Sequence, residues 1–433
     1  MTTRHPHRRL ARLCLLVALG LLPAACGDGS VGGGGGDSDG DAAEPQPSVG
    51  PSQSEAVECS GEPLEFMSIA ALTGPLGGAG AERARIGLDA AINAVNRECS
   101  LGRPLEVEIC DDAADVNGNL ACGREAASNG ALAILTSVGS FDDGVAASGL
   151  PGIFLWGTSA FELTNANAYS SISGIIVGMG GVSAAQAAGA TDFLLVLPDS
   201  PALQFVATQV EQLADLLEIE LETIYFPGDT TDYAPLAAQI AERDPSAIGM
   251  LPAQPVVMMN ALAAEGITPE SHIMSVASIV MTPEVVEELG DTINGLLVVS
   301  PVVPPTDTDN AGIAEFRADL EANGQDPDDP NVDFNTVVSW SNIKKLEESL
   351  LAVDPSVVAS LDSASLVDAI VAHPAARPEA APYDFSANQL PEFPDMAGFR
   401  IFTREVVILE LQDGQYEVVS DGFVDMLHPP TLE

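Results

Sequence analysis

The side chains that could carry catalysis in this chain are carboxylates. Asp111-Asp112 and Asp142-Asp143 are adjacent pairs that could act as general acid and base. The chain has 63 acidic residues, however, so adjacent pairs are expected by chance and most of them belong to solvated faces. The Gly-x-Ser-x-Gly spacing occurs at Gly36-Asp37-Ser38-Asp39-Gly40, where no apolar strand precedes it as a hydrolase nucleophile elbow requires, and no Gly-Lys-Ser/Thr segment supplies a P-loop. We therefore predict a protein that is not an enzyme and needs no cofactor.

Two glycine-rich segments lack the context of a phosphate-binding loop. Gly78-Ala79-Gly80-Ala81-Glu82-Arg83 misses the third glycine of a dinucleotide-binding loop. The glycine run 32–36 follows no strand and precedes no lysine, so a flexible tether is the better interpretation. A metal site is not predicted either, because His272, His373 and His428 are distant in sequence from the cysteines.

From Leu64 onward, apolar strand-like runs alternate with helical runs. The predicted strands are 64–71, 105–110, 131–138, 152–156, 193–197, 220–226, 247–251, 272–276 and 295–301. The predicted helices are 81–96, 119–129, 201–217, 233–243, 255–265, 283–289 and 335–351. This alternation predicts an α/β fold of two lobes, each a parallel sheet with helices on both faces. A strand, turn and strand over 405–420 predict a hairpin near the C-terminus.

Four cysteines, Cys59, Cys99, Cys110 and Cys122, belong to this folded part. Cys59 and Cys99 would lie at the sheet edge where strands begin, and Cys110 and Cys122 at the edge where strands end. A strand of five or six residues separates these edges by ~17–20 Å, whereas a disulfide needs Cα atoms within ~7 Å. We therefore predict the disulfides 59–99 and 110–122, with four free core thiols as the alternative.

The N-terminus has the pattern of an export signal. Four arginines precede the apolar run Leu13–Ala25, which is shorter than the roughly 20 residues of a membrane span. The run ends in Leu-Leu-Pro-Ala-Ala-Cys-Gly, which resembles the lipobox of bacterial lipoproteins. We expect a signal peptide over 1–25, a lipid on Cys26 and a tether over 26–57, with ordinary cleavage near Ala25 as the alternative.

The charge balance excludes several partners. With 16 Lys+Arg against 63 Asp+Glu, the formal net charge is −47. Nucleic acids and anionic membrane surfaces are bound through clustered basic residues, which this chain lacks. Because 46% of the residues are hydrophobic, the acidity does not indicate disorder. Membrane contact is therefore expected only through the lipid on Cys26.

Short segments follow one another in a characteristic order along the chain. Leu72-Thr73-Gly74-Pro75-Leu76-Gly77 lies between a predicted strand and a predicted helix that contains Gly87. The later segments are Asp111-Asp112, 138–143, 158–164, 228–233 and 290–298. In this order they resemble the branched-chain amino-acid (Leu/Ile/Val) type of periplasmic binding protein, the type I solute-binding protein of ABC transporters. The likeness covers roughly residues 60–350, and no single motif carries it.

The resemblance implies two lobes joined by a three-segment hinge. Lobe 1 would comprise 58–175 and 300–373, and lobe 2 would comprise 176–299 and 374–433. A small polar or amphipathic ligand would bind between the carboxyl ends of the two sheets. The implied protein is a monomer on the outer face of the cytoplasmic membrane, anchored through Cys26, that delivers its ligand to an ABC permease. A ligand sensor of the same fold, signalling to a membrane receptor, is the alternative.

The resemblance also indicates candidate ligand residues after the strands of lobe 1: Ser140, Phe141, Asp142, Asp143, Trp156, Thr158 and Ser159. In the family, these loops offer hydroxyls and backbone N–H groups to a ligand carboxylate. Thr158 and Ser159 keep such hydroxyls. Acids at Asp142 and Asp143 would instead favour a cation or a hydroxyl group, or would only cap the following helix. Trp156 would stack on the ligand or pack in the core.

The candidates in lobe 2 are Asp199, Gln254 and Ser278, each after a predicted strand. Amino-acid binders of the family hold the ligand ammonium with an acid near the last of these positions. Ala277 and Ser278 offer no acid, so the resemblance alone does not establish amino-acid specificity. An apolar or hydroxyl-rich small molecule remains equally open.

Overall fold

The computed structural model describes most of the chain beyond the predicted tether. The described residues are 59–73, 79–135, 143–156, 160–252, 254–393, 396 and 398–432. The predicted signal peptide, the predicted lipid attachment at Cys26 and the predicted tether lie outside these residues. Among the described helices, none combines the length and the apolar composition of a membrane-spanning segment.

The first sheet is parallel and has the strand order β2-β1-β3-β4-β5. Its strands are β1 (Leu64–Ala70), β2 (Leu105–Asp111), β3 (Ile134–Leu135), β4 (Gly152–Leu155) and β5 (Ala168–Ser170). The intervening helices are α1 (Ala79–Glu98), α2 (Val116–Asn129), α3 (Asp143–Ser148) and α4 (Ala160–Thr164). In β1 only Glu65 is exposed, as expected for a strand covered on both faces.

The second sheet has the order β12-β11-β10-β9-β8-β6-β7. Its parallel strands are β6 (Asp192–Pro198), β7 (Glu220–Phe226), β8 (Ala247–Met250), β9 (Ile273–Ala277) and β10 (Leu297–Ser300). The accompanying helices are α5 (Gly174–Ala187), α6 (Pro201–Leu216), α7 (Ala234–Ala241), α8 (Pro255–Ala264), η1 (Ser278–Val280), α9 (Pro283–Leu289) and η2 (Gly290–Ile293). The predicted strands and helices of this region are confirmed, with ends that differ by a few residues.

The C-terminal hairpin extends this sheet and requires one correction. The strand β11 (Glu405–Gln412) pairs antiparallel with β10 and with β12 (Gln415–Val418), and the short β13 (Val424–Asp425) pairs with the start of β11. The hairpin is confirmed, but the second sheet is mixed rather than wholly parallel. The reason is that β11 enters after a long connection, which frees its direction from the β-α-β rule.

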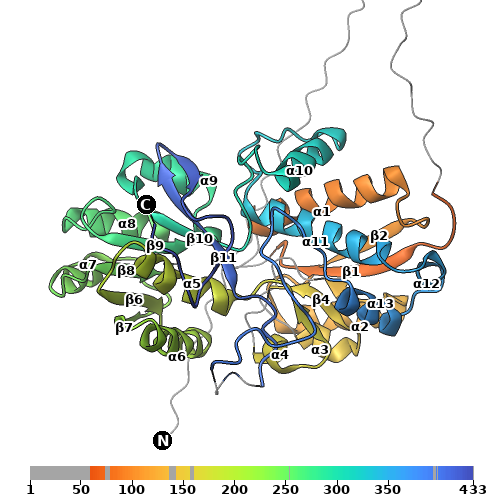
Figure 1. Cartoon of the computed structure of the whole chain (residues 1–433), viewed down its shortest axis with the longest axis horizontal. Helices are drawn as coiled ribbons and strands as arrows, with labels where there is room; N and C mark the ends of the chain where they lie inside the picture. The colour runs from red at the N-terminus through yellow and green to blue at the C-terminus, as the bar shows by residue number, and fades with distance from the viewer. Residues whose placement is uncertain are drawn as a thin grey trace, which may run out of the picture. The chain divides into compact units, whose positions relative to one another are not determined.

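Between β10 and β11 the chain returns to the neighbourhood of the first sheet. Figure 1 shows α10 (Ala311–Ala322) and α11 (Phe334–Leu351) beside α1, and α12 (Pro355–Ala359) and α13 (Ser363–Ala372) near the end of α11. The crossing of α1 and α11 depends on Gly87, because a Cβ there would lie 2.0 Å from the carbonyl oxygen of Thr336. The chain therefore crosses from one sheet to the other three times: between β5 and α5, between β10 and α10, and between α13 and β11. Three crossings are what the type I fold requires.

Both predicted disulfides are present. Cys59 is bonded to Cys99 with their Cα atoms 5.1 Å apart. Cys110 is bonded to Cys122 with their Cα atoms 5.7 Å apart. The first disulfide ties the chain before β1 to the end of α1, and the second ties the end of β2 to α2. The pairing by sheet edge is therefore confirmed.

Candidate ligand-binding site

The predicted site residues divide into two groups. Ser140, Phe141, Asp142, Thr158 and Ser159 lie outside the described residues, so their roles stay predictions. The described candidates each lie at or just beyond the carboxyl end of a strand, or at the start of the helix after it: Asp143, Trp156, Asp199, Gln254 and Ser278.

An apolar cavity of about 180 Å³ lies between α5, α6 and the strands β6, β8 and β9. Of the predicted site residues, Trp156 lines this cavity. It comes from the carboxyl end of β4 in the first sheet, whereas the other described lining residues belong to the second sheet and its helices. The cavity therefore joins elements of both lobes at the edge where ligands of α/β sheets bind.

One wall of the cavity consists of side chains from strands of the second sheet, which point alternately to its two faces. In β6, Phe193, Leu195 and Leu197 line the cavity, which is the period of two of a strand. At the carboxyl-end border Leu251 follows β8, and Ala277 is the last residue of β9. These apolar side chains give the cavity a surface that suits an uncharged group.

The opposite wall is the helix α5, which the sequence analysis missed. Gly174, Gly178 and Gly181 line the cavity at spacings of four and three residues, so they share one face of the helix. The remaining faces of α5 are also buried, so the helix has no polar side and no amphipathic pattern. The spacing of the glycines is the one signal in the sequence that could have located this wall.

Trp156 is positioned by an irregularity in β4. The pairing of β4 with β5 shifts register between Ile153 and Leu155, and Phe154 has a φ of +52°, which is rare for an aromatic residue. The amide of Asn342 on α11 donates to the carbonyl oxygen of Phe154 at 3.1 Å. Such bulges are common beside functional sites, where they redirect a side chain. The bulge lies two residues before Trp156 and sets how the chain leaves the sheet.

The predicted residues of lobe 2 occupy different environments. Ser278 is 2% exposed and lies between Ala277 and Ile279, which both line the cavity. Within the described part of the chain, its hydroxyl has no hydrogen-bond partner. Asp199 is exposed and accepts a hydrogen bond from Gln204 at 2.6 Å. Neither Asp199 nor Gln254 lines the cavity, so of the three only Ser278 adjoins it.

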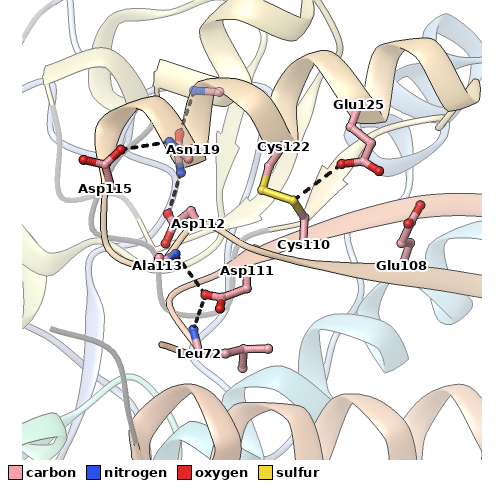
Figure 2. Close-up of a disulfide and its surroundings, with 12 residues drawn as sticks. Leu72, Glu108, Cys110, Asp111, Asp112, Ala113, Asp115, Asn119, Cys122 and Glu125 are labelled. Carbon is pink, nitrogen blue, oxygen red and sulfur yellow. Dashed lines mark hydrogen bonds between the residues drawn. A yellow bond between two sulfur atoms is a disulfide. The ribbon is translucent and has the colours of Figure 1, made fainter. Parts of the chain in front are cut away.

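Asp111 fixes the start of the loop that follows β1 (Figure 2). Its carboxylate accepts hydrogen bonds from the backbone N–H of Leu72 at 3.0 Å and from the hydroxyl of Thr73 at 2.6 Å. The hydroxyl of Thr73 and the surrounding N–H groups lower the pKa of Asp111. This carboxylate therefore holds Leu72 and Thr73 in place at the end of β1.

Asp112 holds the first turn of the helix α3 through Asn119 (Figure 2). Asp112 is fully buried, and its carboxylate accepts a hydrogen bond from the Asn119 amide at 2.8 Å. The amide oxygen of Asn119 accepts from the backbone N–H of Gly144 at 2.6 Å, in the first turn of α3. Asp112 and Asn119 thus hold the helix that begins at Asp143, directly after the predicted ligand turn. The Cys110–Cys122 disulfide links the two elements that carry them.

The described residues contain no group of three or more His, Cys, Asp or Glu side chains that could hold a metal ion. Likewise, none of the described side chains that line the cavity is charged. The described lining is mostly apolar surface, with the aromatic rings of Trp156 and Phe193 and the hydroxyl of Ser275.

Residues 68–386 match the protein family described as periplasmic binding protein. Since this match spans most of the chain, the chain belongs to the periplasmic binding protein family. Its two α/β lobes have the type I fold of that family, as the resemblance predicted. A comparison with curated proteins finds no significant match.

Solved structures with the same fold support this assignment. A solute-binding protein of an ABC transporter from R. palustris, in complex with 4-hydroxybenzoate, is 16% identical with a TM-score of 0.67 over 84% of this chain and 97% of that chain. An ABC transporter substrate-binding protein from Aeropyrum pernix is 16% identical with a TM-score of 0.67 over 84% and 96%. A possible leucine/isoleucine/valine-binding protein from Rhodopirellula baltica is 14% identical with a TM-score of 0.63 over 84% and 98%. At these identities the likeness establishes the fold.

Proposed function

We propose that this protein is an extracytoplasmic solute-binding lipoprotein that captures a small ligand between two lobes and delivers it to an ABC permease. Lobe 1 comprises 58–175 and 300–373, and lobe 2 comprises 176–299 and 374–433. The observation that carries the proposal is the cavity to which Trp156 of one lobe and the strand ends of the other both contribute. Family membership, the export signal and both disulfides support an extracytoplasmic site of action.

The ligand in this proposal is a small polar or amphipathic molecule, and an α-amino acid is disfavoured. At Ala277 and Ser278 the chain offers no acid for a ligand ammonium. The R. palustris relative was solved with 4-hydroxybenzoate, an aromatic acid without an ammonium group. The loops containing Ser140, Thr158 and Ser159 supply hydroxyls for the polar part of the ligand.

Fluorescence gives a direct binding assay, because the chain has only two tryptophans. Trp340 is fully buried and donates its indole N–H to Asp319 at 3.0 Å, so it reports little on the site. The mature chain carrying Cys26→Ser would be titrated with a library of small solutes. Binding should change the emission of Trp156, and Trp156→Phe should abolish that change while Trp340→Phe keeps it. A mature chain that binds no solute class, by fluorescence or by thermal shift, would overturn the proposal.

Cellular assays test the anchor and the transport role. Lipid labelling of the full chain should be lost in Cys26→Ser, and retention of the label would contradict anchoring at that residue. Deletion of the gene should abolish high-affinity uptake of the ligand that the fluorescence assay identifies. Unchanged uptake together with a lost transcriptional response would instead indicate the sensor.

A further inference from the structure

We propose that the cavity between α5, α6 and the second sheet receives the apolar body of the ligand. This body is an uncharged group the size of one six-membered ring, and the polar group of the ligand stays at the border formed by Trp156, Leu251 and Ala277. The inference rests on the proposed function and specifies the ligand class of the same site. It is carried by the volume of the cavity, by its lining and by the glycines that keep it open.

The volume fits one ring. The cavity measures about 180 Å³, and an engineered apolar cavity of about 150 Å³ in another protein stays dry and binds benzene. A single ring or a short branched alkyl group therefore fills this space, whereas a fused pair of rings exceeds it. An amino acid with a small side chain would leave most of the space empty.

The lining excludes charge. The polar side chains of the described lining residues are those of Trp156 and Ser275, and the hydroxyl of Ser275 already lies 3.4 Å from the carbonyl oxygen of Gly181. An ionised carboxylate or ammonium inside would lose its hydration without gaining a partner. Any charged group must therefore remain at the carboxyl-end border, near Trp156 and the hydroxyl of Ser278.

Missing side chains keep the cavity open. A Cβ on Gly178 would lie 3.2 Å from Cγ1 of Val206 on the facing helix α6. A Cβ on Gly181 would lie 3.2 Å from Oγ of Ser275 and 3.9 Å from Cζ of Phe193. At 3.2 Å a methyl group at either position would press against Val206 or Ser275, so alanine would both fill part of the cavity and push on its walls. Glycine weakens a helix relative to alanine, and here the two glycines leave the space between α5 and its neighbours free.

The test uses the mature Cys26→Ser chain and four probes: phenol, 4-hydroxybenzoate, 2-naphthol and glycerol. Phenol and 4-hydroxybenzoate should bind, because each places one uncharged ring in the cavity. Glycerol and 2-naphthol should bind at least about tenfold more weakly. If glycerol binds and the ring compounds do not, the inference fails while the proposed function stands. If no solute of the wider library binds either, both fail.

Glycine variants locate the ring. Gly178→Ala combined with Gly181→Ala should weaken phenol binding about tenfold, because two methyl groups enter the cavity. Gly398→Ala is the matched control, since nothing lies within 4 Å of a Cβ there, and should leave the affinity unchanged. A double variant that binds phenol as tightly as the parent would overturn the inference.

A compensating variant guards against misfolding. Val206→Ala removes the methyl group that faces Gly178, so it should increase the affinity for 2-naphthol relative to phenol. In the Gly178→Ala background, Val206→Ala should restore phenol binding. If it restores thermal stability without restoring phenol binding, misfolding does not explain the lost affinity and the ring does not occupy the cavity.

Discussion

Raising the pH from about 8 to about 10 should stabilise this protein through one buried lysine. Lys345 on α11 is 1% exposed, and its Nζ lies 5.5 Å from the centroid of the Tyr383 ring. Burial lowers the pKa of Lys345 to about 8, an effect that Glu379 opposes and Arg377 reinforces. The folded protein therefore releases this proton at a lower pH than the unfolded chain does.

The sign and size of the effect follow from this difference. Below about pH 8 the lysine is charged in both states, and the folded state bears the full cost of the buried charge. Because the pKa of Lys345 falls from its ordinary value of 10.5 to about 8, this cost is about 3 kcal/mol. As the pH rises through 8 the folded state loses the proton first, so the free energy of unfolding should increase by about 2 kcal/mol by pH 10. Above that pH, burial of Tyr383, whose pKa is raised to about 12, acts in the opposite direction.

Urea unfolding of the mature chain over this pH range, at constant high ionic strength, measures the effect. Lys345→Met should remove the rise. Lys344→Met is the matched control, because Lys344 is the other lysine of the chain. Burial alone would lower the pKa of Lys344, but Glu347 and Glu315 raise it, so the rise should persist in Lys344→Met. Parallel profiles for the parent and Lys345→Met would refute this explanation of the buried charge.

Three further outcomes are expected. Asn119→Ala should lower the free energy of unfolding by about 2–4 kcal/mol, because it leaves Asp112 and the N–H of Gly144 without that partner. The control is Asn129→Ala, an exposed position on the same helix, which should cost less than about 0.5 kcal/mol. Urea unfolding measures both values. Replacing Cys110 and Cys122 by serine should cost about 3 kcal/mol through the loop that the disulfide closes, and an unchanged urea midpoint would contradict this. Raising NaCl from about 0.1 M to about 1 M should raise the Tm, because the Debye length falls from about 10 Å to about 3 Å while the net charge stays near −47; a Tm that falls would refute dominant self-repulsion.

The sequence predicts this fold well where local pattern and burial agree. The strand β7 (Glu220–Phe226) is predicted correctly because its apolar residues largely alternate with polar or exposed ones, as in a half-buried strand. The helix α5 was missed because it is buried on every side, which removes the polar face that periodicity detects. The bulge at Phe154 was also beyond prediction, because it depends on an amide from Asn342, far away in the sequence. Of the predicted site residues Trp156 lines the cavity, whereas the sequence pattern did not predict its glycine wall.

Most of the basic residues in the described part of the chain make contacts within the protein itself. Arg103 donates to the backbone carbonyls of Glu62 and Pro63 before β1, and Arg400 lies against the ring of Tyr169. Arg83 pairs with Asp333 at 3.4 Å. None of these cations lines the cavity, and the acidic surface repels anions that approach from solvent.

Ligand affinity must therefore come first from apolar burial. A ring that buries about 150 Å² gains roughly 4 kcal/mol at about 25 cal/mol per Å², which corresponds to binding at about the millimolar level. Any tighter affinity has to be supplied by hydrogen bonds at the border of the cavity. Thr158, Ser159 and Asp142 lie outside the described residues, and we predict that their polar groups discriminate among ring-bearing ligands.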